Sequence, residues 1–205
     1  MSGEPAHAHA SDIAFTPSVK AWQTRKGSRR AYERMEKSGS WDTSITPDLA
    51  EFIAAQTSVF LATVSEEGQP YIQHRGGSPG FLHVLDDKTI AFADFVGNRQ
   101  FITAGNLARS PKAFLFLMDY RRQRRVKIWG EARIVEGDDA LLARLMPKGY
   151  EARPQHVVIF TVSAFDRNCS QHIPLRFEAA EVQEALAARD RRIEELEAEI
   201  ARLKA

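Results

Sequence analysis

The chain has 205 residues, which is long enough for one domain with a substantial hydrophobic core and additional terminal segments. Its 28 basic and 27 acidic residues give a net charge of +1, and this balance argues against a dedicated nucleic-acid-binding protein. The single cysteine, Cys169, excludes an intramolecular disulfide, and the longest apolar run, Ala113–Met118, is far too short to cross a membrane. With no apolar signal segment at the N-terminus, these features predict a cytoplasmic protein that does not enter a membrane.

Residues 1–45 are predicted to form an N-terminal extension that contains short helices. His7 and His9 lie in its small, polar first segment, and we interpret them as part of a tail rather than as metal ligands. The charged stretch Val19–Lys37 predicts one or two helices that break near Gly27.

The central part of the chain alternates short apolar runs with turn residues, which is typical of a mainly β domain. A helix is predicted first, from Thr46 to about Gln56, because Thr46 can serve as its N-cap and is followed by a proline and an aspartate. The strands predicted after it are Ser58–Val64, Gln69–Arg75, Phe81–Leu85, Thr89–Asp94, Lys112–Tyr120, Arg125–Glu136 and Gln155–Phe165, with helices at Asn98–Ala108 and Asp138–Met146.

Polar and cationic side chains gather where two of these strands end. A helix start favours an anion there, because its first N–H groups are unpaired and the macrodipole is positive. Arg99 adds donors suited to phosphate oxygens, and Arg75 can supply a second cation. This spacing predicts a phosphate pocket; the alternative is that both arginines are solvated beside a simple glycine bulge. Neither GxGxxG nor GxxxxGK[ST] occurs. The residues concerned are Gln73, His74, Arg75, Gly76, Asp94, Asn98, Arg99 and Gln100.

Two strands further along the chain have distinct patterns. Lys112–Tyr120 is almost continuously apolar, which predicts a strand covered on both faces. Arg121–Arg125 contains four arginines, and a hairpin turn explains them better than a nucleic-acid site. Arg125, Lys127 and Trp129 then share one strand face, which either meets a ligand or is a solvated outer face.

The segment after the last predicted strand carries Asn168, Cys169, Gln171 and His172. Cys169 and His172 are close enough in sequence to suggest a nucleophile and its base. Nothing else in the chain resembles a cysteine-hydrolase site, so a loop that lines the edge of a cofactor is the better interpretation.

Residues 177–205 are rich in Ala, Glu, Arg and Leu and predict a C-terminal coiled-coil-like helix. In a parallel two-stranded coil, Arg192 would face Glu197 of a second copy, and Glu199 would face Lys204. The alternative is a single helix packed on its own barrel. The heptad positions hold Val182, Leu186, Arg189, Ile193, Leu196, Ile200 and Leu203.

The segments HRGG, FADFVGNRQF, AGNLARSPKAFLFL and RVKIWGEARIVE, in this order, resemble the pyridoxamine 5′-phosphate oxidase-like family of FMN-binding split barrels. The resemblance covers residues 48–174, and NCSQHIP is similar to a segment of one subgroup. It implies a six-stranded split barrel, which we predict at residues 46–176, and a homodimer with FMN between the subunits. The residues that it implies for cofactor binding are Gln73, His74, Arg75, Gly76, Asp94, Asn98, Arg99, Gln100, Arg125, Lys127, Gln171 and His172.

The resemblance implies an FMN-dependent oxidoreductase that acts on an unassigned small molecule with an unassigned electron donor. Pyridoxamine 5′-phosphate oxidases end in an Arg- and His-bearing substrate segment, whereas this chain ends in the heptad helix, so we do not expect it to make pyridoxal phosphate. No residue stands out as a catalytic acid or base. The alternatives are a flavin-binding protein without turnover, a cofactor-free scaffold, and a haem-binding split barrel whose axial ligand would be His74, His83, His156 or His172.

Overall fold

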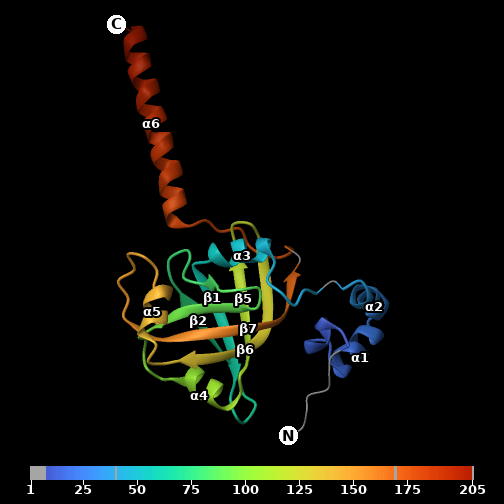
Figure 1. Ribbon diagram of the computed structural model, residues 1–205. Coiled ribbons are helices and arrows are strands. Elements are labelled where there is room, and N and C mark those ends of the chain that lie inside the picture. Colours follow the sequence, from blue (N-terminus) through green and yellow to red (C-terminus); the bar gives the residue numbers. More distant parts are fainter. Residues whose placement is uncertain (1–7, 40, 169, 205) are drawn as a thin grey trace. The chain divides into compact units, whose positions relative to one another are not determined.

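The computed structural model describes residues 8–39, 41–168 and 170–204 (Figure 1). The chain divides into two compact units. The first unit holds residues up to 118 together with residues 125–169, and the second holds residues 119–124 and 170–205. The predicted division into segments 1–45, 46–176 and 177–205 stays a prediction.

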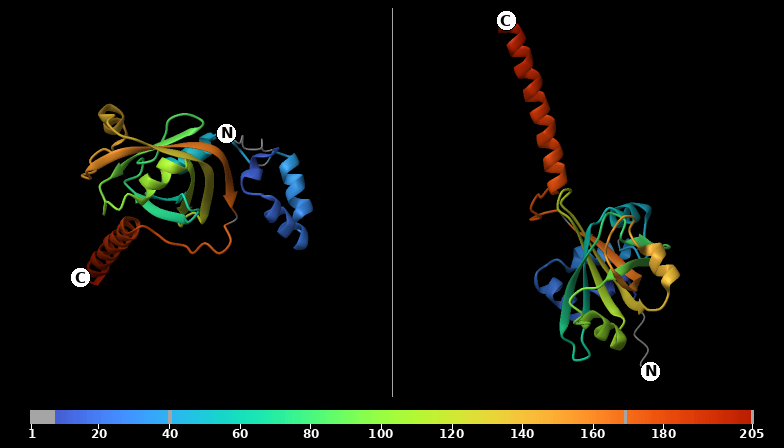
Figure 2. Two further views of the ribbon diagram at one scale, coloured as in Figure 1. Left: turned by 90° about the horizontal axis from the view of Figure 1, so that it is seen from below. Right: turned by 90° about the vertical axis from the view of Figure 1, so that its left-hand side faces the viewer.

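The first unit is built on an antiparallel sheet that curls strongly on itself, as Figure 2 shows. Within the described residues the sheet has seven strands in the order β2–β1–β5–β6–β7–β4–β3, and its two ends do not pair, so the barrel is split. A mainly β barrel with flanking helices is therefore confirmed, although we expected six strands. The strands are β1 Ser58–Val64, β2 Pro70–Gly76, β3 His83–Val84, β4 Thr89–Phe95, β5 Lys112–Asp119, β6 Arg124–Val135 and β7 Pro154–Asn168.

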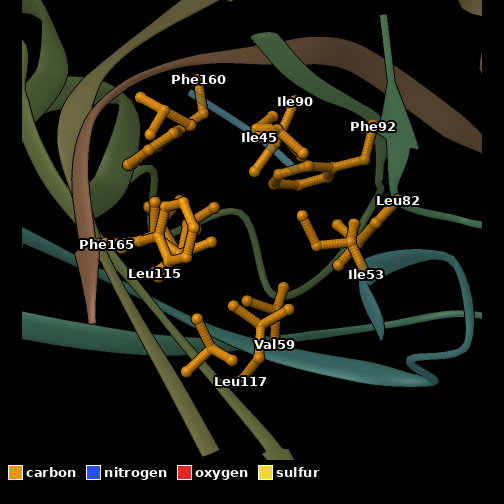
Figure 3. Close-up of a cluster of buried hydrophobic side chains, with 14 of the residues drawn as sticks. Ile45, Ile53, Val59, Leu82, Ile90, Phe92, Leu115, Leu117, Phe160 and Phe165 are labelled. Carbon is orange, nitrogen blue, oxygen red and sulfur yellow. The ribbon is translucent and has the colours of Figure 1, made fainter. Parts of the chain in front are cut away.

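In β1 and β5 the core of the barrel follows from alternation along the strand, whereas β4 is buried on both faces. In β1, Val59 and Leu61 are fully buried, whereas Phe60 between them is only partly buried. The inner side chains of several strands converge on one cluster, shown in Figure 3, which includes Leu115, Phe92 and Phe160. Burying large apolar side chains in this way contributes about 1.5–3 kcal/mol each, which makes the cluster the main source of stability.

Strand β5 differs from its sequence-based expectation. Its inner residues, including Leu115 and Leu117, are buried, but Phe114 and Phe116 on the other face are only partly buried. Phe116 lies opposite Phe60 of β1 in the register. The apolar run is therefore covered on one face in the single chain, and its other face forms part of a half-exposed apolar surface.

Helices α3, α4 and α5 contact strands of the sheet (Figure 1). Helix α3 begins as predicted, because the Thr46 hydroxyl accepts a hydrogen bond from the Leu49 amide at 3.3 Å. Its apolar face, with Leu49, Phe52 and Ile53, is buried. The helices are η1 Ala10–Ile13 (a 3-10 helix), α1 Pro17–Arg25, α2 Arg29–Lys37, α3 Pro47–Ala54, α4 Ile102–Arg109, α5 Asp139–Leu145 and α6 Ala179–Lys204.

The prediction that a helix opens at Asn98 is wrong, because α4 begins at Ile102. The Asn98 side chain accepts a hydrogen bond from the Gln100 amide at 3.2 Å, and a local turn of this kind competes with helix formation. Arg99 and Phe101 then adopt left-handed conformations, with φ of 60° and 55°, which a right-handed helix does not contain. Residues 96–101 are therefore a loop between β4 and α4.

The N-terminal helices contact the barrel through aromatic side chains. Phe15 lies 5.4 Å from Trp41, and Trp41 stacks on Trp129 of β6 with ring centroids 4.9 Å apart. Backbone pairing of Asp42 with Phe165 of β7 adds a second attachment. His7 of the predicted tail lies outside the described residues.

The second unit consists of the turn between β5 and β6, the segment from residue 170 onward, and α6. Arg121 forms an ion pair with Glu181, and Gln123 donates a hydrogen bond from Nε2 to the Ile173 carbonyl at 2.6 Å. None of the residues described in α6 is buried. Among the helices that the structure describes, none combines the length and the apolar composition needed to span a bilayer.

Candidate functional site

At the split, the edge strand β2 approaches β4, which lies beside the other edge strand β3, and a surface hollow lies there. Residue 75 of β2 and residue 94 of β4 meet across the split, and the loop 96–101 and the start of α4 form the rest of the wall. Six of the predicted site residues line this hollow: Gln73, Arg75, Asp94, Asn98, Arg99 and Gln100. An adjoining hollow is lined by the predicted His74 and Gly76, and it shares Arg75 and Asp94 with the first.

Asp94 is the most enclosed charged group of the hollow, with 6% of the residue exposed. Its Oδ2 lies 3.0 Å from His156 Nε2, and its Oδ1 lies 2.9 Å from Arg75 Nε. His156 is itself buried and stands directly opposite Asp94 in the β4–β7 register. A carboxylate placed between two such nitrogens can hold both side chains in fixed orientations.

Arg75 retains unused hydrogen-bonding capacity. Its Nε is buried and close to Asp94, but the two groups are not aligned for a hydrogen bond, and this Nε–H has no acceptor among the described residues. The Nε is closed to solvent, so a ligand in the hollow would meet the rest of the Arg75 guanidinium. This observation favours an anionic ligand with several acceptor oxygens.

The positive end of α4 faces the same hollow, although the helix begins later than predicted. Thr103 and Ala104 of its first turn line the hollow, and the N-cap residue Phe101 provides no side-chain cap. The first amides of a helix have no partner within the helix, so they remain available to an anion. Arg99 is exposed beside them, with its guanidinium 5.9 Å from the Phe101 ring.

Two hydrogen bonds fix α4 against the sheet. Thr103 donates from Oγ1 to Gln73 Oε1 at 2.8 Å, and the buried Asn106 donates from Nδ2 to Thr63 Oγ1 at 2.9 Å. Gln73 therefore positions the helix start as well as lining the hollow. Because α4 is anchored at two points, its first amide groups are pre-organised, and a ligand does not have to order them on binding.

The glycines beside the site have a packing role. A Cβ atom on Gly77 would lie 2.6 Å from the Phe81 Cβ, which is closer than carbon atoms approach. A Cβ on Gly76 would lie 3.0 Å from the His74 ring. The need for glycine at both positions is therefore explained by the close approach of the Phe81 and His74 side chains.

Arg125 and Lys127 are not brought to the hollow within one chain. Lys127 lies on β6 and forms an ion pair with Asp166, with Nζ and Oδ2 2.8 Å apart. Asp166 lies ten residues beyond His156 on β7. Because a strand rises about 3.3 Å per residue, Lys127 lies far along the sheet from the hollow that His156 lines. Lys127 also approaches the Trp129 ring at 5.4 Å. Neither Arg125 nor Lys127 lines the hollows described above.

Gln171 and His172 belong to the second unit, where both are exposed and His172 has a left-handed φ of 63°. Their role at the cofactor remains a prediction. Cys169, which could have paired with His172 as a nucleophile, lies outside the described residues.

The histidines considered as haem ligands have varied surroundings. His156 contacts Asp94, and His83 Nε2 lies 3.2 Å from the Leu145 carbonyl oxygen, whereas His74 is exposed with its ring 5.6 Å from Phe60. Within the described part of the chain, no group of three or more His, Cys, Asp or Glu side chains is placed to hold a metal ion.

The sequence did not identify His156, Gln155 and Thr103 as lining residues of a flavin site. The strand register brings His156 opposite Asp94, and the sequence gives no direct signal of that pairing. Arg153 was also missed; it lines a neighbouring hollow together with Arg99.

A family model described as pyridoxamine 5′-phosphate oxidase matches residues 45–169, more than half of the chain. No curated protein sequence matches.

Among solved structures, HupZ of Group A Streptococcus is 24% identical, with 65% of this chain and 99% of HupZ covered and a TM-score of 0.50. A Lactobacillus delbrueckii protein provisionally described as a pyridoxamine 5′-phosphate oxidase is 21% identical, with 61% and 95% covered and a TM-score of 0.47. An FMN-binding protein of Syntrophomonas wolfei is 16% identical, with 71% and 97% covered and a TM-score of 0.44. At these identities, the likeness to HupZ supports the fold and nothing further.

Proposed function

The chain belongs to the pyridoxamine 5′-phosphate oxidase-like family, and from this premise we propose that it binds FMN and uses it in an oxidoreductase reaction on a small molecule. The observation that carries the proposal is the hollow that Arg75, Arg99 and the first turn of α4 line together, where α4 starts without a side-chain cap. This donor set fits a phosphate monoester, the terminal group of FMN. When bound, FMN supplies hydride or electron transfer.

The phosphate would be held by Arg75, Arg99 and the first amides of α4. Hydrogen bonds to charged groups are worth about 1.5–3 kcal/mol each, so three such contacts suffice for tight binding. Asp94 and His156 act on the phosphate through Arg75, because Asp94 fixes the direction of that guanidinium. The remaining predicted residues of the two hollows, including Asn98 and Gln100, would contact the ribityl chain or the ring.

We further propose that the functional unit is a homodimer built on the outer face of β2, β1, β5 and β6. That face carries half-exposed Phe60, Phe114 and Phe116, and Ile72 on β2 is 59% exposed. An apolar sheet face of this kind is typical of a surface that pairs. Arg125 and Lys127 belong to the same face of β6, so a second copy would bring its own Arg125 and Lys127 toward the hollow, where they would stabilise negative charge on the flavin ring.

Electron transfer at a flavin requires no protein acid or base by itself, and the residues of the hollow suggest none for the substrate. The catalytic step therefore depends on how the protein holds the flavin ring and admits the donor.

The decisive experiment is the absorbance spectrum of the purified protein, followed by acid release and identification of the chromophore. We expect flavin bands and FMN at one equivalent per chain. Release of FAD, a Soret band, or failure to bind added FMN would each overturn the proposal. Oxidation of NAD(P)H by the FMN-loaded protein, measured against free FMN, then separates an enzyme from a flavin carrier.

A further inference from the structure

Helix α6 has an apolar stripe that the chain leaves uncovered. The helix spans 26 residues, from Ala179 to Lys204, and none of its described residues is buried. A helix of this length held together only by its own backbone is marginally stable in water, so most such helices bury one face. The apolar residues of the stripe are between 41% and 81% exposed: Val182, Leu186, Ile193, Leu196, Ile200 and Leu203.

The order of the apolar residues indicates which partner would cover them. In heptad notation, Ile193 and Ile200 occupy position a, and Leu196 and Leu203 occupy position d. Isoleucine at a with leucine at d favours a parallel coiled coil of two strands over higher oligomers. The seam is self-complementary in that arrangement, so a second copy of the same helix fits it.

The charges beside the seam favour the parallel orientation. In a parallel pair, position g of one helix faces position e of the other five residues further on, which sets Arg192 against Glu197 and Glu199 against Lys204. In an antiparallel pair of full overlap, Arg192 would instead face Arg192 of the second copy, and Asp190 would face Asp190. Like charges would then meet on both sides of the centre, which disfavours that orientation.

One position of the seam is charged. Arg189 occupies a d position, and Asp190 follows it at e, on the rim of the hole into which the Arg189 side chain of a parallel partner inserts. Only the in-register parallel arrangement places Arg189 of each helix beside Asp190 of the other. A single polar layer of this kind lowers stability but fixes register.

We propose that α6 pairs with α6 of a second copy of this chain as a parallel, in-register, two-stranded coiled coil, in which the Arg189 layer sets the register. The pairing is independent of the cofactor, since none of its residues belongs to the hollow between β2 and β4. In the proposed dimer of barrels, the two α6 helices are tethered to the same assembly. Their high effective concentration then compensates for the short seam.

Disulfide trapping in the full-length protein tests the arrangement. In a Cys169→Ser background, Leu196→Cys places a thiol at a d position, and Ala198→Cys places one on the opposite face of the same turn. Under mild oxidation we expect rapid covalent dimer formation with Leu196→Cys and little with Ala198→Cys. Equal rates for the two variants would overturn the proposal. So would faster linkage between a Leu186→Cys chain and a Leu196→Cys chain than between two Leu196→Cys chains, because that result marks antiparallel pairing.

Charge reversal supplies a second measurement that does not depend on FMN. In the Leu196→Cys background, Arg192→Glu sets two carboxylates against each other and should slow disulfide formation several-fold. Adding Glu197→Arg to the same chain restores opposite charges and should restore the rate. A double variant as slow as the single one would show that this pair does not form. Loss of FMN binding with unchanged trapping would leave the proposal intact.

Discussion

At the scale of single residues, the hollow is organised by Asp94. Its carboxylate stands between His156 and Arg75, two side chains from strands that are not neighbours of each other in the sheet. Arg75 and Arg99, by contrast, are cations that line the hollow. The site therefore separates two tasks: Asp94 fixes geometry, and the arginines and the α4 amides meet the ligand.

Arg99→Ala should weaken FMN binding by roughly 2 kcal/mol, which is about a 30-fold increase in Kd, because the phosphate loses a charged donor. Riboflavin lacks the phosphate, so its Kd should be almost the same for the variant and the parent; both are measured by flavin fluorescence quenching. Arg109→Ala, at the other end of α4, is the matched control, since the ion pair of Arg109 with Glu66 is exposed. An equal loss of riboflavin affinity would assign Arg99 a structural role.

Asp94→Ala should lower the free energy of unfolding by about 3 kcal/mol, because it leaves the buried His156 and the partly buried Arg75 without their partner. Urea unfolding followed by circular dichroism gives the value. Asp87→Ala, at an exposed turn position, should change it by less than about 0.5 kcal/mol. A comparable loss for both variants would mean that the contacts of Asp94 carry no special stability.

At the scale of secondary structure elements, the sequence predicts an element correctly where a single physical rule determines it. The strand Ser58–Val64 and the helix start at Thr46 follow from alternation and from capping, and the structure contains both. The start of α4 could not be predicted in the same way, because the Asn98 side chain forms a local turn and Arg99 adopts a left-handed conformation. Helical propensity predicts neither the Asn98 turn nor the left-handed conformation of Arg99.

The candidate site shows the same division. The sequence predicts the residues from Gln73 to Gly76 and from Asn98 to Gln100 as one site because two arginines and an expected helix start converge there, and the structure gathers members of both segments around adjoining hollows. His156 was missed as a flavin-site residue because its neighbourhood depends on strand order. Lys127 has a direct intrachain partner, Asp166, that only the β6–β7 register shows.

The N-terminal helices should loosen in acid. Lys20 donates a hydrogen bond from Nζ to Asp12 Oδ1 at 2.7 Å, and this bond lowers the pKa of Asp12 below its ordinary value of 3.8. A lowered pKa in the folded state means that the stabilisation is present above about pH 4 and is lost as the pH falls through the lower folded value.

Asp12→Asn isolates this contribution. The difference in unfolding free energy between parent and variant, measured by tryptophan fluorescence, should be larger at pH 6 than at pH 2.5. Glu51→Gln, on the exposed surface of α3, serves as a control whose difference should vary less. A parent–variant difference that is constant with pH would contradict the role given to Lys20 and Asp12.

At the scale of the whole molecule, two surfaces are proposed to join copies of the chain: the outer face of the sheet and the seam of α6. The sheet face presents several aromatic side chains, whereas the α6 seam holds fewer than three uninterrupted heptads. The sheet face should therefore supply most of the association free energy, and α6 should add stability and fix orientation.

Deleting residues 181–205 should leave a dimer that still binds FMN but unfolds at a lower temperature. Because each site would share its walls between subunits, dilution of the truncated protein should release flavin as dimers separate. Sedimentation with and without FMN, together with Leu196→Ser in the full-length chain as a variant that disrupts only the seam, provides the measurement. A truncated monomer that retains FMN at full affinity would place the site within one chain.

The cross-strand pair of Asp94 and His156 also constrains the order of events during synthesis. The two residues are separated by 62 positions, and β5, β6 and α5 lie between them in the chain. A ribosome must therefore complete nearly the whole barrel before the last strand can reach β4, and contacts of such long sequence separation form slowly. Until then Asp94 lacks His156, and the hollow lacks one of its walls. A ligand that needs this wall would therefore bind after the last strand is in place, although the proposed phosphate donors are synthesised earlier.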